Sequence, residues 1–349
     1  MKAVIRAIEY HLPERVLDNA TLAAAFSGWD ARKIEDKTGI RQRHIAAEGE
    51  CASDLAVVAA GKLFNSGACR ASDMDCLMLC TQSPDYFLPT TACLLQHRLG
   101  LPQSCAAFDF NLGCSGFVYG LSIAKGLIET GQARNVLLIT AETYSKYIHP
   151  QDKSVRTIFG DAAAATWIAG VEADEDFLGP FVFGTDGAGA ENLIVPTGGQ
   201  RRAAVANAGV EEDKSGNRRT VNNLFMNGAQ IFEFTLRVVP LTVQQLLAKA
   251  RRNADSVDYW VFHQANGYML KHLREQLGLP PEKFIVSMAD CANTVSSTIP
   301  IAIKQLHSAG RLRDGHSLAL VGFGVGYSWA GTLVRWQELP SAQGAQTNC

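Results

Sequence analysis

Short apolar runs alternate with segments of helical period along this chain. The runs Cys76–Cys80, Ala106–Phe110 and Asn135–Thr140 predict three buried strands. Directly after the second run, apolar residues recur every three or four positions and predict a helix. These residues are Phe117, Leu121, Ala124 and Ile128. Buried strands that alternate with amphipathic helices are typical of an α/β fold.

The same rhythm returns in the second half of the chain. Tyr259–Phe262 and Ser317–Val321 predict two further buried strands, and Ile301–Ala309 predicts a helix. Asp75 directly precedes the first strand of the first half, and Asp258 directly precedes the first of these later strands. The two acids lie about 180 residues apart, which indicates an internal repeat.

The repeat predicts two halves of one duplicated fold, residues 1–172 and 173–340. The boundary falls where an acidic segment, residues 171–176, interrupts the apolar pattern. Residues 200–223 form the longest polar stretch of the second half and predict a surface excursion, because loops of this composition run over the surface. Residues 341–349 are expected to be a frayed tail.

Composition bounds the class of protein. With 349 residues, 47% of them hydrophobic, the chain is long enough to bury a large core or two fused ones. A net charge of −2 gives no electrostatic reason to expect nucleic acid or an anionic membrane as a partner. No apolar run approaches the ~20 residues of a membrane span, and the N-terminus lacks the apolar h-region of a signal peptide. The nine cysteines indicate reduced thiols in the cytoplasm, and the histidine spacings predict no metal site.

Cys114 is the strongest candidate for a reactive residue. It is predicted to lie between the strand Ala106–Phe110 and the helix that follows. Unpaired N–H groups and the positive dipole end at a helix N-terminus favour a thiolate, and the flanking Gly113 and Gly116 let a substrate approach the sulfur. The alternative is a small buried cysteine before an ordinary helix.

Two later segments supply the groups that cysteine chemistry needs as partners. His263 follows the strand Tyr259–Phe262, and ligands bind at the carboxyl ends of strands in open α/β sheets. Asn293 opens a hydroxyl-rich run that predicts a shaped polar loop. The repeat places Asn293 next to the position equivalent to Cys114. A thiol, an imidazole and an amide are the parts of acyl transfer on a cysteine.

Six motifs stand in a fixed order along the chain. They are Lys37–Arg41, the segment around Cys114, Phe159–Asp161, the segments around His263 and Asn293, and Gly322–Trp329. The last, rich in glycine, joins two predicted strands and does not open a helix, so it lacks the context of a nucleotide-binding loop. Together these motifs resemble the β-ketoacyl-acyl-carrier-protein synthase III family of the thiolase superfamily, and the resemblance runs from His11 to Trp336.

The resemblance implies a five-layered αβαβα fold with two duplicated halves, and a homodimer. It assigns a catalytic triad to Cys114, His263 and Asn293, and an oxyanion hole to the backbone N–H groups of Cys114 and Val325. The implied reaction is acylation of Cys114 by an acyl thioester, followed by decarboxylative condensation with a malonyl thioester, as in fatty acid biosynthesis. The implied partners are acyl-coenzyme A and acyl-carrier protein, with no cofactor.

Other classes stay open at this point. A synthase-III-like acyltransferase of secondary metabolism would move the acyl group without decarboxylation. A thioester hydrolase or a protease-like hydrolase would use the same three side chains, and a catalytically silent scaffold would use none. Release of carbon dioxide from a malonyl thioester separates the condensing enzyme from all of these.

The residues expected to bind substrate depart from the family pattern. Lys33 stands where the family often has a tryptophan that stacks on adenine, and Lys153 stands where it often has an arginine. An ammonium group stacks less well than an indole or a guanidinium group. Ala292 stands where the residue before the amide is usually glycine. The substrate-binding or carrier-binding residues that the resemblance assigns are Lys33, Lys37, Lys153, Arg237, Asn266 and Arg274.

Two expectations concern protein contacts. The resemblance places Leu88 in a segment that crosses the subunit boundary and forms a wall of the neighbouring acyl pocket. Tyr268 and Glu233 occupy places that commonly hold basic residues for carrier docking. Arg237 and Arg274 are therefore the predicted cations of a shifted docking patch, although such charges on a helix are more often a solvated face.

Overall fold

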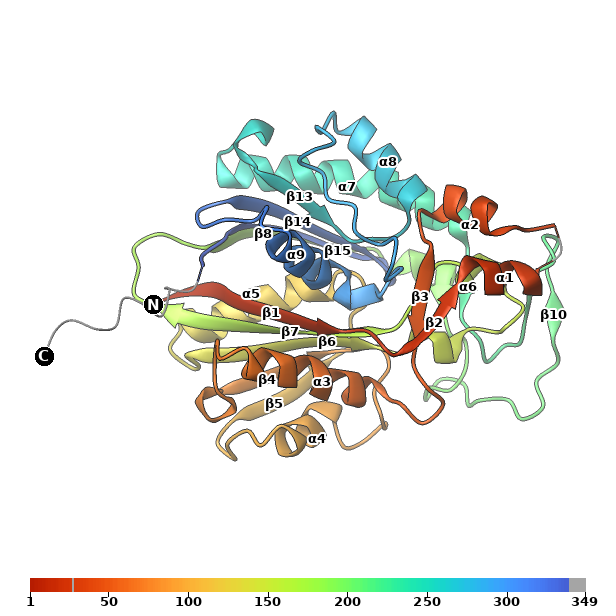
Figure 1. Ribbon diagram of the computed structural model, residues 1–349, viewed down its shortest axis with the longest axis horizontal. Helices are drawn as coiled ribbons and strands as arrows, with labels where there is room; N and C mark the ends of the chain where they lie inside the picture. Colours follow the sequence, from red (N-terminus) through yellow and green to blue (C-terminus); the bar gives the residue numbers. More distant parts are fainter. Residues whose placement is uncertain (27, 339–349) are drawn as a thin grey trace, which may run out of the picture.

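Two mixed β-sheets form the frame of the molecule (Figure 1). The computed structural model describes residues 1–26 and 28–338. In the first sheet the order is β1-β7-β6-β4-β5, with β6, β4 and β5 parallel and the other two pairings antiparallel. Its strands are β1 (Lys2–His11), β4 (Cys76–Cys80), β5 (Ala106–Phe110), β6 (Asn135–Glu142) and β7 (Ala162–Val171). The three strands predicted in the first half are β4, β5 and β6, the last being longer than predicted.

The second sheet repeats this plan. Its order is β13-β14-β15-β8, with β13 parallel to β14 and the other pairings antiparallel. Its strands are β8 (Leu178–Thr185), β13 (Tyr259–Phe262), β14 (Ser317–Gly324) and β15 (Ser328–Arg335). Phe284 makes an isolated parallel bridge to Trp260 of β13, in the place that β5 takes beside β4. Each strand of the second sheet therefore has a counterpart in the first.

Asp75 and Asp258 show the repeat at the level of single hydrogen bonds. The Asp75 carboxylate accepts from the backbone N–H of Asn135, the first residue of β6, at 2.8 Å. The Asp258 carboxylate accepts from the backbone N–H of Ser317, the first residue of β14, at 2.8 Å. Each acid fixes the start of the strand beside its own, so the sequence repeat reflects one structural device used twice.

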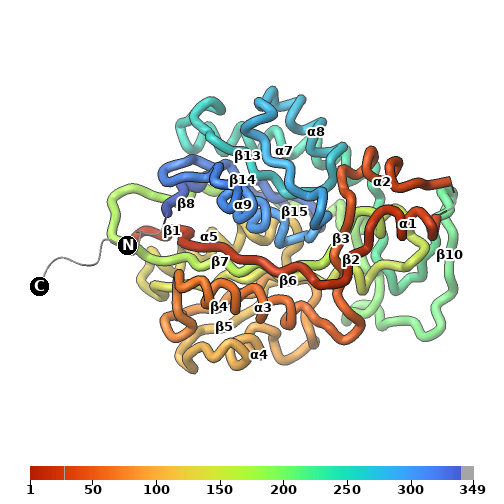
Figure 2. The backbone as a smooth tube through the Cα atoms, in the orientation of Figure 1, coloured from red at the N-terminus to blue at the C-terminus, as the bar shows by residue number. Residues whose placement is uncertain are grey.

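Helices complete five layers. Helix α5 (Gly116–Glu129) and helix α9 (Thr298–Ser308) lie between the sheets, as Figures 1 and 2 show. Helix α5 contacts strands of both sheets, and α9 contacts β1 and β13. Helices α3 (Ala52–Asn65) and α4 (Thr91–Arg98) cover the outer face of the first sheet, while α7 (Gly228–Ala250) covers the second with α8 (Gly267–Gln276) beside it. The predicted αβαβα arrangement is confirmed.

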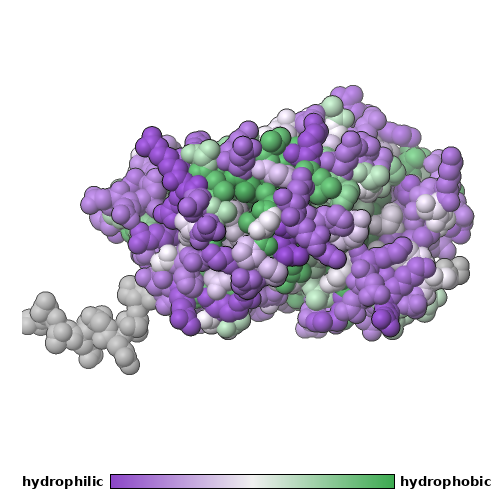
Figure 3. Space-filling model, turned by 90° about the horizontal axis from the view of Figure 1, so that it is seen from above, coloured by the Kyte–Doolittle hydropathy of each residue, from purple (hydrophilic) through white to green (hydrophobic). Residues whose placement is uncertain are grey.

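Helix α7 is the one described helix that is long and apolar enough to cross a membrane by length and composition. It carries Glu233 and Arg237, so its apolar sequence is interrupted. Its Phe234, Val239 and Leu246 are buried in the core beside β14 and β15. These contacts are those of a core helix that packs on a sheet. Figure 3 views the molecule from this side and shows hydrophilic and hydrophobic side chains mixed on the surface.

Smaller elements surround the end of the sheets where β5, β13 and β14 finish. They are β2 (Arg15–Asp18), α1 (Asn19–Ala25), α2 (Ala31–Thr38), β3 (Gln42–Ile45), α6 (Lys153–Arg156), β9 (Leu193–Ile194) and β12 (Phe225–Met226). The stretch 200–223 contains the hairpin of β10 (Glu211–Glu212) and β11 (Arg218–Arg219). Arg219 pairs at 2.9 Å with the fully buried carboxylate of Asp152, so the predicted excursion is anchored to the body of the protein.

Cysteines and termini complete the description. The eight cysteines within the described residues are free thiols. Within the same residues no cluster of three or more His, Cys, Asp or Glu side chains could hold a metal ion. Cys349 and the predicted tail, residues 341–349, lie outside the described residues. The predicted boundary between residues 172 and 173 falls between β7 and β8 and stays a prediction.

Candidate active site

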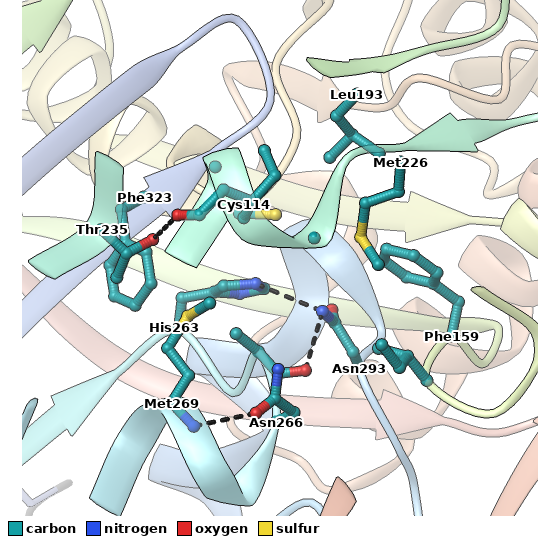
Figure 4. A pocket seen from close by; sticks show the side chains of 15 residues that line it. Cys114, Phe159, Leu193, Met226, Thr235, His263, Asn266, Met269, Asn293 and Phe323 are labelled. Atoms are coloured by element: carbon teal, nitrogen blue, oxygen red, sulfur yellow. Dashed lines mark hydrogen bonds between the residues drawn. The ribbon is translucent and has the colours of Figure 1, made fainter. Parts of the chain in front are cut away.

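Three loops meet over one small cavity. Cys114 lies between β5 and α5, His263 follows β13, and Asn293 lies shortly before α9. Their side chains are buried, with exposed fractions of 5%, 2% and 4%. All three line a cavity of about 60 Å³ whose other walls are largely apolar, and Figure 4 shows them directed toward it. The structure therefore brings together the three residues that the sequence singles out.

His263 and Asn293 form a neutral pair. The Asn293 Nδ2 lies 3.4 Å from the His263 Nε2, and its Oδ1 accepts from the Val295 N–H at 2.9 Å, which holds the amide nitrogen toward the imidazole. The His263 Nδ1 lies 2.8 Å from the Thr298 hydroxyl oxygen. Burial lowers the pKa of His263 to about 3, so the ring is uncharged at neutral pH. A neutral imidazole donates from one nitrogen only.

The Asn293 loop is held in a strained shape. The Asn293 N–H donates to the Ile158 carbonyl, and the Asn293 carbonyl accepts from the Gly160 N–H, both at 3.0 Å. Hydrogen bonds to the first half of the chain therefore hold the loop in place. Ala292 and Val295 have φ of 64° and 55°, in the left-handed region. That region costs a residue with a side chain roughly 1–2 kcal/mol. Ala292, the departure from the glycine usual in the resembled family, therefore pays strain that a glycine would avoid.

The Cys114 loop is instead given room by glycines of β14. A Cβ atom at Gly324 would lie 2.7 Å from the Cys114 sulfur, and one at Gly322 would lie 2.7 Å from the Cys114 carbonyl oxygen. Both contacts are too short for any side chain, so these two positions require glycine. The Ser115 hydroxyl lies 2.7 Å from the Ser328 hydroxyl of β15, which ties the start of α5 to the second sheet.

The expectation that the helix N-terminus favours a Cys114 thiolate is wrong for this structure. Burial raises the pKa of the thiol to about 12. The backbone N–H groups of Val325 and Cys114 lower the pKa, but their effect is smaller than that of burial. These are the two N–H groups that the resemblance assigns to an oxyanion hole. Within the described residues no hydrogen bond joins the thiol to His263.

Most of the predicted substrate-binding lysines lie at a second, larger cavity. Lys37, Lys153 and Asn266 line a surface cavity of about 580 Å³. Trp29 lies in the same wall, with the Lys37 and Lys33 ammonium groups 4.9 and 5.4 Å from its ring centroid. Sequence reasoning missed Trp29, because it considered only the position of Lys33. The single tryptophan before Thr38 was the available signal.

Two of these residues have structural partners as well. The Lys153 ammonium group hydrogen-bonds the carbonyl of Ser215, so the excursion 200–223 forms part of this cavity. The Asn266 side chain accepts from the Met269 N–H at 2.8 Å and caps α8. Asn266 also lines the cavity of Cys114, so it lies between the two cavities.

The remaining predicted residues lie elsewhere. Arg237 is 3.5 Å from Asp186, and Arg274 is 3.4 Å from Glu275, so each cation has an acidic neighbour. Neither arginine lines the two cavities described above. Leu88 is 83% exposed, and the two residues before it, Tyr86 and Phe87, are exposed aromatic residues. Leu88 does not line the cavity of Cys114 in its own chain.

Glu142 is a buried carboxyl group near the site that sequence reasoning missed. It ends β6 and is fully buried. It accepts hydrogen bonds from the Gln82 N–H at 3.0 Å and from the Ser83 and Ser296 hydroxyls at 3.1 and 2.8 Å. Burial raises its pKa to about 8. A carboxylate directly after a buried strand was the available signal, but the predicted strand stopped at Thr140.

Comparison with known proteins gives a consistent result. Residues 108–187 match the family described as 3-oxoacyl-[acyl-carrier-protein] synthase III, and residues 247–336 match the C-terminal part of that family. The β-ketoacyl-[acyl-carrier-protein] synthase III of Caldanaerobacter subterraneus subsp. tengcongensis is 34% identical, over 94% of this chain and 96% of its own length.

Solved structures agree with this match. A crystal structure of a 3-oxoacyl-(acyl-carrier-protein) synthase III superposes with a TM-score of 0.95 at 54% identity, covering 96% of this chain and 100% of its own. A 3-oxoacyl-(acyl-carrier protein) synthase from Burkholderia xenovorans LB400 superposes with a TM-score of 0.89 at 37% identity, covering 97% and 95% of the two chains. The similarity therefore extends over the whole fold.

Proposed function

The chain belongs to the 3-oxoacyl-[acyl-carrier-protein] synthase III family, a group of condensing transferases of fatty acid biosynthesis, and on that premise we propose how its residues perform the reaction. The observation that supports the proposal is the convergence of Cys114, His263 and Asn293 on one buried cavity. The β-ketoacyl synthase III reaction has two half-reactions. Each makes a different demand on these residues.

In the first half-reaction Cys114 takes up the acyl group. Its sulfur attacks the thioester carbonyl, the bond between that carbon and the leaving thiol breaks, and the cysteine proton passes to the leaving sulfur. The backbone N–H groups of Cys114 and Val325 stabilise the oxyanion. Because burial raises the pKa of the resting thiol, deprotonation is coupled to attack and the resting enzyme stores no thiolate.

In the second half-reaction a malonyl thioester loses carbon dioxide. His263 and Asn293 donate hydrogen bonds to its thioester carbonyl as the enolate forms, and the enolate carbon then attacks the acyl-cysteine. The Cys114 sulfur leaves and recovers a proton. Each donor of this kind contributes roughly 3–4 kcal/mol to transition-state stability. In the structure the Asn293 Nδ2 faces His263 Nε2, and the Thr298 hydroxyl donates to the Val295 carbonyl at 3.1 Å. Donation from Nε2 therefore requires the imidazole proton to move to Nε2 and the Thr298 hydroxyl, 2.8 Å from Nδ1, to turn and donate to Nδ1.

The proposal extends to partners and location. The acyl donors are thioesters of coenzyme A or of acyl-carrier protein, no further cofactor takes part, and the enzyme is a cytoplasmic homodimer. The exposed run of Tyr86, Phe87 and Leu88 supports a second subunit at this face, because contiguous exposed apolar side chains mark interaction sites. Relatives named as synthases do not favour the acyltransferase or hydrolase alternatives.

The Leu88→Ala variant tests the dimer. If Leu88 walls the acyl pocket of the second subunit, the truncation opens space there, and longer or branched primers load faster than on the parent enzyme. Loading rates of straight-chain and branched acyl thioesters provide the measurement, with light scattering to report the oligomeric state. A fully active monomer would contradict this part of the proposal.

One experiment separates the proposed reaction from its alternatives. The enzyme is mixed with an acyl thioester and a carboxyl-labelled malonyl thioester, and both carbon dioxide and the β-ketoacyl product are measured. The proposal predicts equal amounts of the two. Acyl transfer without carbon dioxide would favour the acyltransferase. Release of free acid alone would favour a hydrolase, and an unmodified protein with no product would favour a scaffold.

A further inference from the structure

A further cavity adjoins the nucleophile loop, and His263 is not among the residues that line it. In the single chain it measures about 790 Å³ and is lined in part by Val325 and by Leu193, which also lines the cavity of Cys114. Tyr86 and Phe87, of the segment proposed to lie at the subunit boundary, line it as well. A Cβ atom at Gly113 would lie 2.6 Å from the Gln82 Oε1 and 2.6 Å from the Val325 Cγ1. Gln82 therefore packs directly against the residue before Cys114. The cavity of Cys114 itself, about 60 Å³, has room for only a few atoms of an acyl chain.

The two walls of this larger cavity differ in character. One wall is aliphatic and includes Leu193, Val195 and Leu224. Other lining residues carry a directed chain of hydrogen bonds: the Tyr144 hydroxyl donates to the Gln82 Oε1 at 2.5 Å, and the Gln82 Nε2 donates to the Asn111 Oδ1 at 3.0 Å. All three of these polar residues line the cavity.

The direction of the chain defines what its ends can still bind. The Asn111 amide oxygen accepts, so its NH₂ group keeps two N–H donors, and within the described residues that nitrogen makes no hydrogen bond to protein. The Tyr144 hydroxyl uses its proton on Gln82, so its oxygen keeps an acceptor site. Tyr144 is only 4% exposed and contacts the hydrophobic cluster that contains Cys114. The Asn111 end of the chain offers donors, and the Tyr144 end offers an acceptor.

A hydrocarbon chain in this cavity would cover these groups without offering them a hydrogen bond. Polar groups deprived of water are costly unless a new partner appears. A hydroxyl group is such a partner, because it both donates and accepts one hydrogen bond. The aliphatic wall meanwhile suits the carbon skeleton that carries it.

We propose that the primer loaded on Cys114 is a short acyl group that bears a hydroxyl substituent, bound by the polar wall formed by Gln82, Asn111 and Tyr144. This inference rests on the proposed acylation of Cys114 and adds the class of acyl group. The polar wall selects the primer, and the aliphatic wall limits its length. Sites built to hydrogen-bond a substrate hydroxyl discriminate strongly against analogues that lack it, because their own polar groups then stay unpaired.

The test uses isosteric pairs of primers. N-acetylcysteamine thioesters of 3-hydroxybutanoic and 4-hydroxybutanoic acids are compared with those of 3-methylbutanoic and pentanoic acids, in which a methyl group replaces the hydroxyl. Acylation of Cys114 is followed by intact-protein mass. We expect at least one hydroxyacyl group to load about tenfold faster than its methyl isostere, or more. Equal or faster loading of both methyl isosteres overturns the inference but leaves the proposed function intact.

Variants assign the preference to the polar wall. Tyr144→Phe removes both the acceptor oxygen and the hydrogen bond that the hydroxyl donates to Gln82, and Gln82→Leu removes the middle of the hydrogen-bond chain. Both variants should bring the loading ratio close to one or reverse it. Tyr259→Phe is the matched control, since the Tyr259 hydroxyl bonds the Arg311 carbonyl far from this cavity and its loss should leave the ratio unchanged. An unchanged ratio in both wall variants contradicts the inference. Failure of every thioester to acylate Cys114 contradicts the proposed function instead.

Discussion

The Cys114 loop and the Asn293 loop occupy equivalent places in the two halves, yet they are built in opposite ways. The first is relaxed, and Gly322 and Gly324 of the other half leave it space. The second is strained at Ala292 and Val295 and is gripped through its backbone by the first half. A nucleophile must admit substrate at its sulfur, whereas an amide donor must keep one orientation. One duplicated frame thus supports two loops with opposite mechanical requirements.

Burial also shifts the pKa values of the ionisable groups around these two loops. Burial raises the pKa of Cys114 to about 12 and that of Glu142 to about 8, and it lowers the pKa of His263 to about 3. The thiol and the imidazole are therefore uncharged at pH 7, and burial favours the neutral form of the Glu142 carboxyl group. Negative charge develops only in the reacting substrate, on the oxyanion or the enolate. Fixed hydrogen-bond donors then stabilise it without competition from water.

The largest expected effect comes from removing the nucleophile. Cys114→Ala should lose acylation completely. Cys291→Ala should retain it, although burial raises the pKa of Cys291 to about 12 as well. The two thiols have similar acidity and burial, so the difference isolates the glycine-lined loop and its backbone N–H groups. Intact-protein mass after mixing with an acyl thioester decides, and a mass increase that persists in Cys114→Ala contradicts the assignment.

The next effect separates the roles of the two loops. His263→Ala and Asn293→Ala should each slow decarboxylation of a malonyl thioester about 10²–10³-fold, the usual cost of losing one oxyanion donor. Acylation of Cys114 should slow much less, since no hydrogen bond joins its thiol to His263 within the described part of the chain. Single-turnover measurements of each half-reaction provide the comparison. Equal losses in both half-reactions would refute the division of labour.

The frame of the fold was readable from sequence because its signals are local. Each apolar run of the first half became a strand, and the Asp75 and Asp258 repeat became a pair of equivalent hydrogen bonds. Apolar period and turn chemistry depend on neighbours along the chain, so a sequence pattern carries them.

The details of the site were less readable because they depend on contacts distant in sequence. The thiol pKa of Cys114 is governed by burial under β14, more than 200 residues away, which the dipole argument did not include. Glu142 accepts a hydrogen bond from Ser296, and Gln82 accepts one from Tyr144. Neither partner is a sequence neighbour, so the sequence pattern did not show these interactions. Trp29 lines the surface cavity, but the sequence comparison considered only the position of Lys33 and so did not find it.

The third prediction concerns how the buried Glu142 carboxyl group makes the stability of the fold depend on pH. Glu142 has a folded-state pKa of about 8, raised by burial from the ordinary value of 4.5. The unfolded chain therefore loses this proton at lower pH than the folded protein does. The stabilising contribution is complete below pH 4.5 and is lost as pH rises through 8.

Glu142→Gln should remove this pH dependence. In the parent it changes the free energy of unfolding by at most roughly 5 kcal/mol over the whole pH range. Denaturant unfolding of the parent and the variant between pH 5 and 8 measures it. The parent should lose stability more steeply with rising pH than the variant. Parallel curves would show that Glu142 is ionised in the folded protein, with its three hydrogen-bond donors outweighing burial.

The smallest expected effect concerns docking on the outer side of the second half. The resemblance implies that Tyr268 and Glu233 stand in places that commonly hold cations, and the remaining cations near these places are Arg237, Lys271 and Arg274. Charge reversal at either arginine should slow transfer from a carrier-bound substrate several-fold, because carrier proteins are acidic and such steering depends on cations. Small thioester mimics should react at the parent rate, since neither arginine lines the cavity of Cys114.

Arg335→Glu is the matched control for these reversals. Arg335 also pairs with an acid, Glu175 at 2.5 Å, but it is the last residue of β15, whose first residue, Ser328, contacts Ser115 beside Cys114. Because Arg237 and Arg274 each have an acidic neighbour, their reversal must exceed the effect of Arg335→Glu to count as docking. If both reversals match this control with the carrier-bound substrate, the shifted patch is wrong, and coenzyme A thioesters become the favoured donors.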